Sequence, residues 1–164
     1  MRRDATSKSC VVLDIDGVLA DVRHRLRFVT TRPKNWNAFF AAASDDPPLE
    51  VGVRFTREAS SSHDIVYLTG RPERTRDDTL AWLRHHNLPD GELIMRREGD
   101  RRPAVMTKTQ ALRRLAKNHH IELVLDDDPM VVESLERHGF PVRLADWMSR
   151  DEALTDAQER EGRT

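Results

Sequence analysis

Two aspartates with one residue between them follow a short apolar run near the start of this 164-residue chain. Asp14 and Asp16 come after Cys10-Val11-Val12-Leu13, and the run Cys10 to Ile15 is typical of a buried strand. In an extended strand residues i and i+2 point to the same face, so both carboxylates are predicted to emerge side by side at the strand's carboxyl end, where open α/β sheets place their ligands. Carboxylates this close repel each other by roughly a few kcal/mol. A divalent cation between them, or a proton on one of them, relieves the repulsion, which indicates a metal-assisted phosphoryl-transfer site.

Other reactive groups follow other predicted strands. They are Thr69, Gly70 and Arg71 after Asp64–Leu68, Lys108 at the start of the helix after Glu92–Met95, and Asp126, Asp127 and Asp128 after Ile121–Leu125. One such group arises easily by chance, but four in this order do not.

The alternation of these strands with helical stretches predicts an α/β fold with a parallel sheet covered by helices on both faces. The expected helices are Glu73–His86, Thr107–Asn118 and Pro129 to about His138, and Val142–Leu144 closes the sheet. Proline near a first turn and the three acidic residues before it indicate a helix N-terminus, which Asp128 is expected to cap.

One segment is too long for a simple crossover. Residues 21–62 contain a probable helix with Trp36, Phe39 and Phe40, a turn at 45–48, and a second helix from about Leu49 to Ser60. Because this segment starts directly after the aspartate pair, it is predicted to form a small helical cap above the site. The core is then residues 1–20 and 63–150, and residues 151–164 form a charged tail.

These motifs resemble those of the haloacid-dehalogenase (HAD) superfamily of phosphotransferases, in the same order. The four motifs are Asp14-x-Asp16-Gly17-Val18, Thr69, Lys108, and the pair Asp126-Asp127. The resemblance covers roughly residues 9–147 and implies a Rossmann-like HAD core. Within the superfamily, the stretches around Thr69-Gly70-Arg71, Met95 to Asp100, Lys108 and Asp126-Asp127 are similar to the 3′-phosphatase domain of phage polynucleotide kinase.

The resemblance implies a mechanism and a role for each site residue. Asp14 would be the nucleophile that forms an aspartyl-phosphate, and Asp16, held protonated, would serve as general acid and then base. Magnesium would be bound by Asp14, the Asp16 backbone carbonyl and Asp127, with Asp126 close by. Lys108 would neutralise charge and Thr69 would cradle the phosphoryl group, while Gly70 supports the turn and Arg71 and Arg96 bind substrate phosphate.

The substrate implied is a 3′-phosphate on a nucleic-acid end or nucleotide, which suggests a role in nucleic-acid repair. Asp128 stands where the phage domain has a basic residue, and no Gly-x-x-x-x-Gly-Lys-Ser/Thr loop occurs, so 5′-phosphorylation is not expected. Two other functions fit the sequence: a small-molecule phosphatase for nucleoside monophosphates or sugar phosphates, and a non-catalytic nucleic-acid-end binding protein. The carboxylates of Asp14 and Asp16, which repel each other, would give a protein that only binds nucleic-acid ends no advantage, which argues against this last alternative.

Composition sets further bounds. Charged residues make up 34% and hydrophobic residues 38% of the chain, no apolar stretch is as long as a membrane span, and the start lacks a signal-peptide pattern. A single cysteine, Cys10, suits a reducing compartment, so a cytoplasmic location is expected. The sequence indicates neither an oligomeric state nor a choice between DNA and RNA. Trp36, Phe39 and Phe40 fit cap packing better than base stacking, although stacking stays open.

Overall fold

A five-stranded parallel sheet forms the centre of the computed structural model, which describes residues 8–148 and 160–163. The strands lie in the order β3-β2-β1-β4-β5. Their bounds are β1 Lys8–Leu13, β2 Asp64–Pro72, β3 Gly91–Arg96, β4 His119–Asp126 and β5 Val142–Leu144. This order confirms the predicted Rossmann-like fold and places β1 between β2 and β4.

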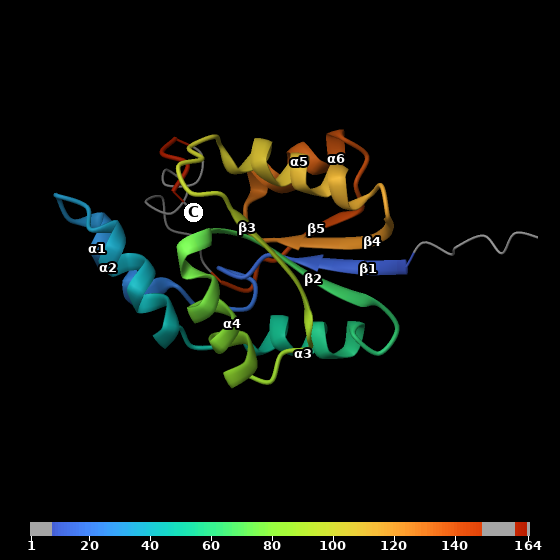
Figure 1. Cartoon of the computed structure of the whole chain (residues 1–164), viewed down its shortest axis with the longest axis horizontal. Helices are drawn as coiled ribbons and strands as arrows, with labels where there is room; N and C mark the ends of the chain where they lie inside the picture. The colour runs from blue at the N-terminus through green and yellow to red at the C-terminus, as the bar shows by residue number, and fades with distance from the viewer. Residues whose placement is uncertain (1–7, 149–159, 164) are drawn as a thin grey trace, which may run out of the picture.

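Helices cover both faces of the sheet (Figure 1). On one face lie α3 (Glu50–Ala59) and α4 (Arg76–His85), and on the other lie α5 (Ala104–Leu115) and α6 (Pro129–Arg137). Side chains of β1 alternate between two apolar clusters: Val11 and Leu13 pack on the α3 and α4 side, and Cys10 and Val12 pack on the α5 and α6 side. Burial on both faces explains why the stretch Cys10–Leu13 is apolar at every position rather than alternating with polar residues.

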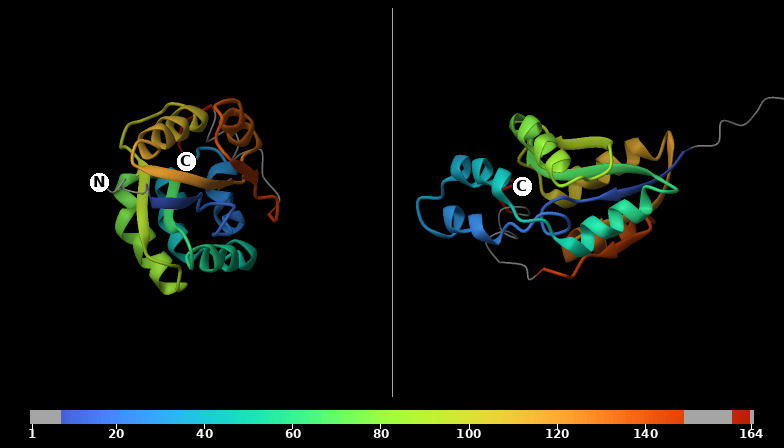
Figure 2. Two further views of the ribbon diagram at one scale, coloured as in Figure 1. Left: turned by 90° about the vertical axis from the view of Figure 1, so that its right-hand side faces the viewer. Right: turned by 90° about the horizontal axis from the view of Figure 1, so that it is seen from below.

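Residues between β1 and α3 form a helical projection beyond the carboxyl ends of the strands (Figure 2, right). It contains a 3₁₀ turn at Arg23–Arg25, α1 (Arg27–Thr30), α2 (Trp36–Ala41) and a second 3₁₀ turn at Ala42–Asp45. Four of its residues, Val22, Val29, Phe39 and Phe40, share an apolar cluster with Met148, which follows β5. The assignment of this segment as a small cap stays a prediction.

The second helix of the segment predicted as cap behaves differently. Val53 of α3 is buried in the apolar cluster on the α3 and α4 side of the sheet. Gly52, also in α3, lies so close to the core segment after β1 that a Cβ built on it would be 1.9 Å from the backbone oxygen of Val18. This packing argues for assigning α3 to the core, and the proposed division between core and cap at residue 62 stays a prediction.

Some element bounds differ from those expected. β1 ends at Leu13 rather than Ile15, and β2 continues through Pro72, so that Thr69, Gly70 and Arg71 lie within the strand instead of after it. Residues 151–159 and 164 of the predicted tail, like residues 149–150 at the end of the predicted core, are outside the described residues. Among the described residues, no helix is long and apolar enough to cross a membrane.

Candidate active site

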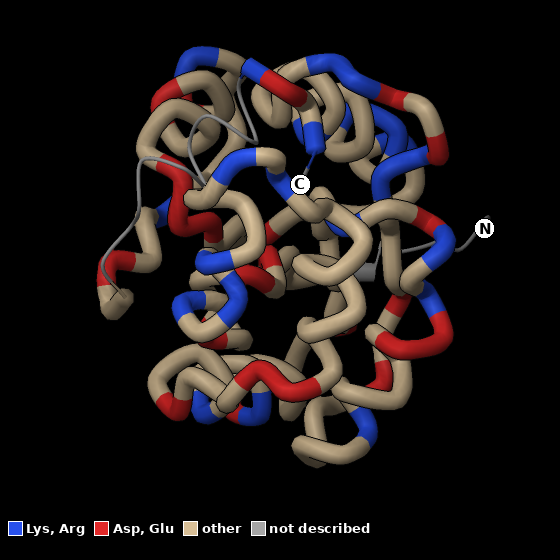
Figure 3. The backbone as a smooth tube through the Cα atoms, turned by 90° about the vertical axis from the view of Figure 1, so that its left-hand side faces the viewer, with Lys and Arg blue, Asp and Glu red and all other residues tan. Residues whose placement is uncertain are grey.

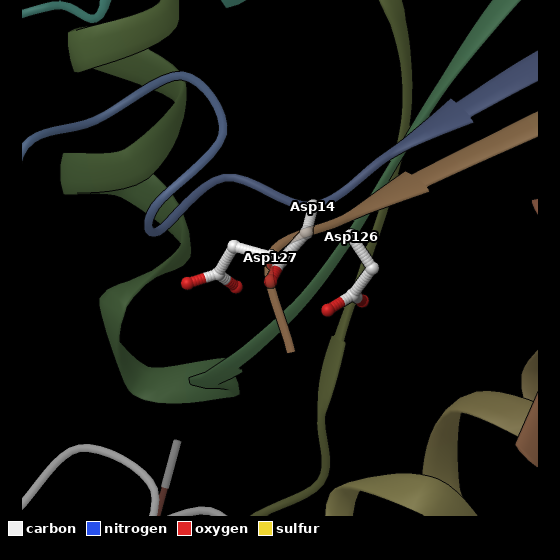
Figure 4. A group of neighbouring side chains, drawn as sticks. All are labelled: Asp14, Asp126 and Asp127. Atoms are coloured by element: carbon white, nitrogen blue, oxygen red, sulfur yellow. The ribbon is translucent and has the colours of Figure 1, made fainter. Parts of the chain in front are cut away.

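Three buried carboxylates meet at the carboxyl ends of two neighbouring strands (Figure 4). Asp14 follows β1, Asp126 ends β4 and Asp127 comes next, and one oxygen of each lies within 4.8 Å of the others. The backbone N–H of Asp14 donates to the carbonyl of Leu125 at 3.0 Å, which continues the pairing of β1 with β4 beyond the last strand residue. Sheet register therefore brings these carboxylates together.

Lys108 of α5 supplies the cation of this cluster. Its Nζ donates to Asp14 Oδ2 at 2.9 Å and to Asp126 Oδ2 at 2.5 Å. Burial works against its charge, but the carboxylates of Asp126 and Asp14 outweigh burial and raise the pKa of Lys108. Burial also raises the pKa of Asp14 well above its usual range, and Lys108 offsets this only in part. The lysine therefore stays charged beside a nucleophile candidate.

The composition of the cluster fits a divalent cation. Lys108 pairs with two of the three carboxylates, Asp14 and Asp126, and oxygen-only donors are what Mg²⁺ prefers. Gly17 permits the arrangement: its φ is +79°, and a Cβ there would lie 2.1 Å from Asp127 Oδ2. A residue with a side chain at this position would displace the carboxylate.

Asp16 lies in a different environment from the one expected. Its Oδ1 accepts from Arg25 Nη2 at 2.9 Å and from Arg71 Nη2 at 2.6 Å. Burial alone would raise its pKa, but Arg71 and Arg25 outweigh it and lower the pKa of Asp16 to about 2. The side chain is therefore ionised, not protonated as predicted, and it is not part of the three-carboxylate cluster.

The physical reason is the early end of β1. Because the strand stops at Leu13, the rule that places i and i+2 on one face does not apply to Asp14 and Asp16. Each carboxylate has its own cation, Lys108 for the first and the arginines for the second, so no shared ion is needed to relieve their repulsion. The predicted role of the Asp16 backbone carbonyl as a metal ligand stays a prediction.

Two members of this second network were not identified from the sequence. Arg25, from the cap, is fully buried and also donates to Asp46 through Nε at 2.9 Å. Asp46 accepts from Arg71 at 3.0 Å, and its backbone oxygen accepts from Trp82 Nε1 at 2.8 Å. Both residues belong to stretches that resemble solvated surface and a turn, and a single sequence carries no signal of their burial.

The remaining predicted site residues lie within β2 and at the end of β3. Thr69 Oγ1 is buried and accepts from the backbone N–H of Arg71 at 3.2 Å. Arg71 itself is only 1% exposed and directs its guanidinium at Asp16 and Asp46. Arg96 donates to the carbonyls of Gly70 and Arg102 at 3.3 and 2.8 Å, which orders the loop after β3. Substrate binding by Gly70, Arg71 and Arg96 stays a prediction.

Asp128 has the predicted capping role. Its carboxylate accepts from the backbone N–H of Met130 at 2.9 Å at the start of α6.

The family model described as the polynucleotide kinase PNKP phosphatase domain matches residues 8–145. A chain of a Pnkp1/Rnl/Hen1 complex superposes with a TM-score of 0.71 at 22% identity, covering 88% of this chain and 47% of that one. A haloacid dehalogenase-like hydrolase from Streptococcus pneumoniae has a TM-score of 0.59 at 15% identity, covering 94% and 92%. At these identities the structures show the fold alone.

Among curated proteins, the protein retinal degeneration B of Drosophila melanogaster is 28% identical over 118 residues, which is 70% of this chain and 8% of that protein. The chain therefore spans less than a tenth of this curated relative and about half of the Pnkp1 chain.

Proposed function

The chain belongs to the family of polynucleotide kinase PNKP phosphatase domains, and from this premise we propose that it is a magnesium-dependent phosphomonoesterase that removes 3′-phosphates from nucleic-acid ends. The observation that carries the proposal is the buried cluster of Asp14, Asp126 and Asp127 beside Lys108. Three buried carboxylates gathered beside one buried lysine suit metal-assisted phosphoryl transfer better than a structural role.

In the proposed reaction, Asp14 attacks phosphorus. Its Oδ1 accepts from the backbone N–H of Ile15 at 2.7 Å and its Oδ2 from Lys108 at 2.9 Å, so the carboxylate is held in one orientation. A bond forms between a carboxylate oxygen and phosphorus while the bond to the substrate's ester oxygen breaks, which yields an aspartyl-phosphate. Mg²⁺ bound by Asp14, Asp126 and Asp127 would neutralise phosphate charge.

Asp16 would move the protons. Its Oδ2 is buried and has no hydrogen-bond partner among the described residues, whereas Oδ1 accepts from both arginines. Because Asp16 is ionised at rest, Oδ2 would first take a proton from solvent and pass it to the leaving oxygen, and the same oxygen would then take a proton from the water that hydrolyses the aspartyl-phosphate. Because the arginines favour the ionised form, Asp16 is better prepared for the second, basic step than for the first.

The experiment is a phosphate-release assay, with Mg²⁺ and with EDTA, on 3′-phosphorylated DNA and RNA oligomers, 3′- and 5′-mononucleotides and sugar phosphates. We expect Mg²⁺-dependent release that is fastest from the oligomers. Asp14→Asn should abolish release, and the exposed Asp77→Asn on α4 serves as matched control.

The other outcomes separate the alternatives. Faster release from mononucleotides or sugar phosphates would assign the chain to small-molecule hydrolysis. Binding of oligomers without release from any substrate would indicate a non-catalytic end-binding protein, and full activity of Asp14→Asn would exclude Asp14 as nucleophile.

A further inference from the structure

A hollow of about 460 Å³ lies on the cap, and its lining includes none of the three carboxylates of the cluster. Its lining, here called the cap groove, consists of Pro33, Lys34, Asn35, Trp36, Asn37 and Arg163. Five of these residues precede or begin α2, and the sixth comes from the described C-terminal residues. In Figures 1 and 2 the cap and the C-terminus lie on the same side of the sheet, beyond the carboxyl ends of the strands.

The groove has an aromatic wall. Trp36 is half-buried, and its ring lies 5.6 Å from that of Phe39 and 6.1 Å from that of Phe40, centroid to centroid. Lys34 Nζ is 5.7 Å and the Arg163 guanidinium 5.5 Å from the Trp36 centroid. Both cations lie over the indole ring and Phe40 stacks against it, so a nucleobase stacks on Trp36 by displacing Lys34 or Arg163 from the ring.

The groove is continuous with a group of positive charges. Gly162 packs tightly on Arg101: a Cβ built on Gly162 would lie 2.1 Å from the backbone oxygen of Arg101. This contact places the next residue, Arg163, near the loop after β3. Burial is the main cause that lowers the pKa of Arg163; Arg101 and Arg74 lower it further, and Glu161 acts against them, so positive charges lie close to this guanidinium. Figure 3, which views the molecule from the cap side, shows basic segments close to the C-terminus.

Carboxylates compensate only part of this charge. Among the described residues, Lys34 pairs with Glu161 and Arg74 pairs with Glu98 at 3.1 Å, so that these two carboxylates face four cations, the other two being Arg101 and Arg163. Arg74 lies in the 3₁₀ turn directly after β2, next to the strand end that carries Thr69 and Arg71. The excess positive charge therefore extends from the cap groove toward the strand ends.

We propose that the cap groove binds the single-stranded segment adjoining a nucleic acid's 3′ end, with a base on Trp36 and backbone phosphates on Arg163 and Arg101. This inference deepens the proposed function and rests on it for the identity of the polymer. Stacking combined with a positive track is the way proteins bind single strands without sequence preference. An acidic peptide would match the charge but would leave the indole surface unused.

The test is fluorescence anisotropy with a labelled, unphosphorylated decathymidylate, without Mg²⁺. Trp36→Ala is expected to weaken binding about tenfold through lost stacking. Arg163→Gln is expected to weaken it and to reduce the slope of log K against log salt by about 0.7, the effect of one phosphate contact on a single strand. Arg137→Gln, an exposed arginine on α6, is the matched control and should bind like the parent chain.

Because Trp36 packs on Phe39 and Phe40, its replacement by alanine could unfold the cap, so thermal unfolding of Trp36→Ala is measured first. If this variant does not fold, the decamer affinities of Trp36→Leu and Arg163→Gln are used to test the inference. The inference is overturned if the parent chain does not bind the decamer, if Arg163→Gln matches Arg137→Gln, or if polyglutamate competes as well as the oligonucleotide.

The probe has no 3′-phosphate, so binding does not depend on catalysis. Loss of decamer binding in the variants, combined with release only from small phosphates, would support the groove and refute the proposed substrate. Release from 3′-phosphorylated oligomers that is slowed equally in Arg163→Gln and Arg137→Gln would refute the groove and support the substrate.

Discussion

Replacing Gly17 with alanine tests the arrangement of the carboxylate cluster directly. The new Cβ would lie 2.1 Å from Asp127 Oδ2 and 2.4 Å from its Cγ, so the Asp127 side chain must move. Gly139 provides the matched control, because its φ of +81° is nearly that of Gly17 (+79°) while nothing lies within 4 Å of a Cβ built there. Both variants carry the same backbone penalty, about 1–2 kcal/mol for a left-handed residue with a side chain.

The difference between the variants therefore reports the contact with Asp127. A displaced ligand should weaken Mg²⁺ binding at least about tenfold, as measured by titration calorimetry. In thermal unfolding, Mg²⁺ at a concentration of 100 Kd stabilises a folded protein by about 2.7 kcal/mol, and a tenfold weaker site loses about 1.4 kcal/mol of this. We expect Gly139→Ala to retain the full Mg²⁺ stabilisation and Gly17→Ala to lose at least half of it.

Equal Mg²⁺ affinity in the two variants would refute the reasoning. Either Asp127 would not be a metal ligand, or its carboxylate would not lie against Gly17. A larger loss of stability in Gly17→Ala without Mg²⁺, combined with an unchanged affinity, would confirm the contact and exclude the metal role.

Three further predictions concern buried and capping groups. Arg25→Ala leaves the buried carboxylates of Asp16 and Asp46 short of a partner, so the free energy of unfolding in urea should fall by about 3–5 kcal/mol. A loss under about 1 kcal/mol, which is usual for exposed ion pairs, would contradict the burial of Arg25. Burial raises the pKa of Cys10 to about 11 from its ordinary 9.0, so Ellman's reagent should react slowly with the folded protein and rapidly in urea. Since the folded state favours the protonated thiol, its stabilising effect is complete below pH 9.0 and is lost as pH rises through about 11; urea midpoints should fall across this window more steeply than in Cys10→Ala. Asp128→Ala should cost about 1 kcal/mol by removing the N-cap of α6, Asp128→Ser should retain most of that stability, and equal melting temperatures for both would argue against the cap.

The sequence allowed the prediction of those features that local pattern or strand order determines. Apolar runs ending in acidic residues located β1 and β4, and parallel strands necessarily end at one edge of the sheet. Lys108 could be assigned beside Asp14, 94 positions away, because a family resemblance supplied the pairing. The capping role of Asp128 followed from the proline after it.

Properties that depend on distant partners could not be predicted. Arg25 stands in a basic stretch that looks like solvated surface, and it is buried only because Asp46, 21 positions later, is folded against it. The protonation state of Asp16 depends on that same arginine and on Arg71, 55 positions away. No local periodicity encodes such contacts, since they form only when the cap is packed on the core.

That packing has a consequence for how substrates enter. Arg25 belongs to the cap, yet its guanidinium is shared between Asp16 of the core and Asp46 at the end of the cap segment. A cap that swung aside in each catalytic cycle would have to break the buried ion pairs of Arg25 with Asp16 and of Arg71 with Asp46 every time. We therefore expect the opening between cap and core to keep the same width throughout turnover. Only substrates narrow enough to fit this opening would then reach the carboxylate cluster.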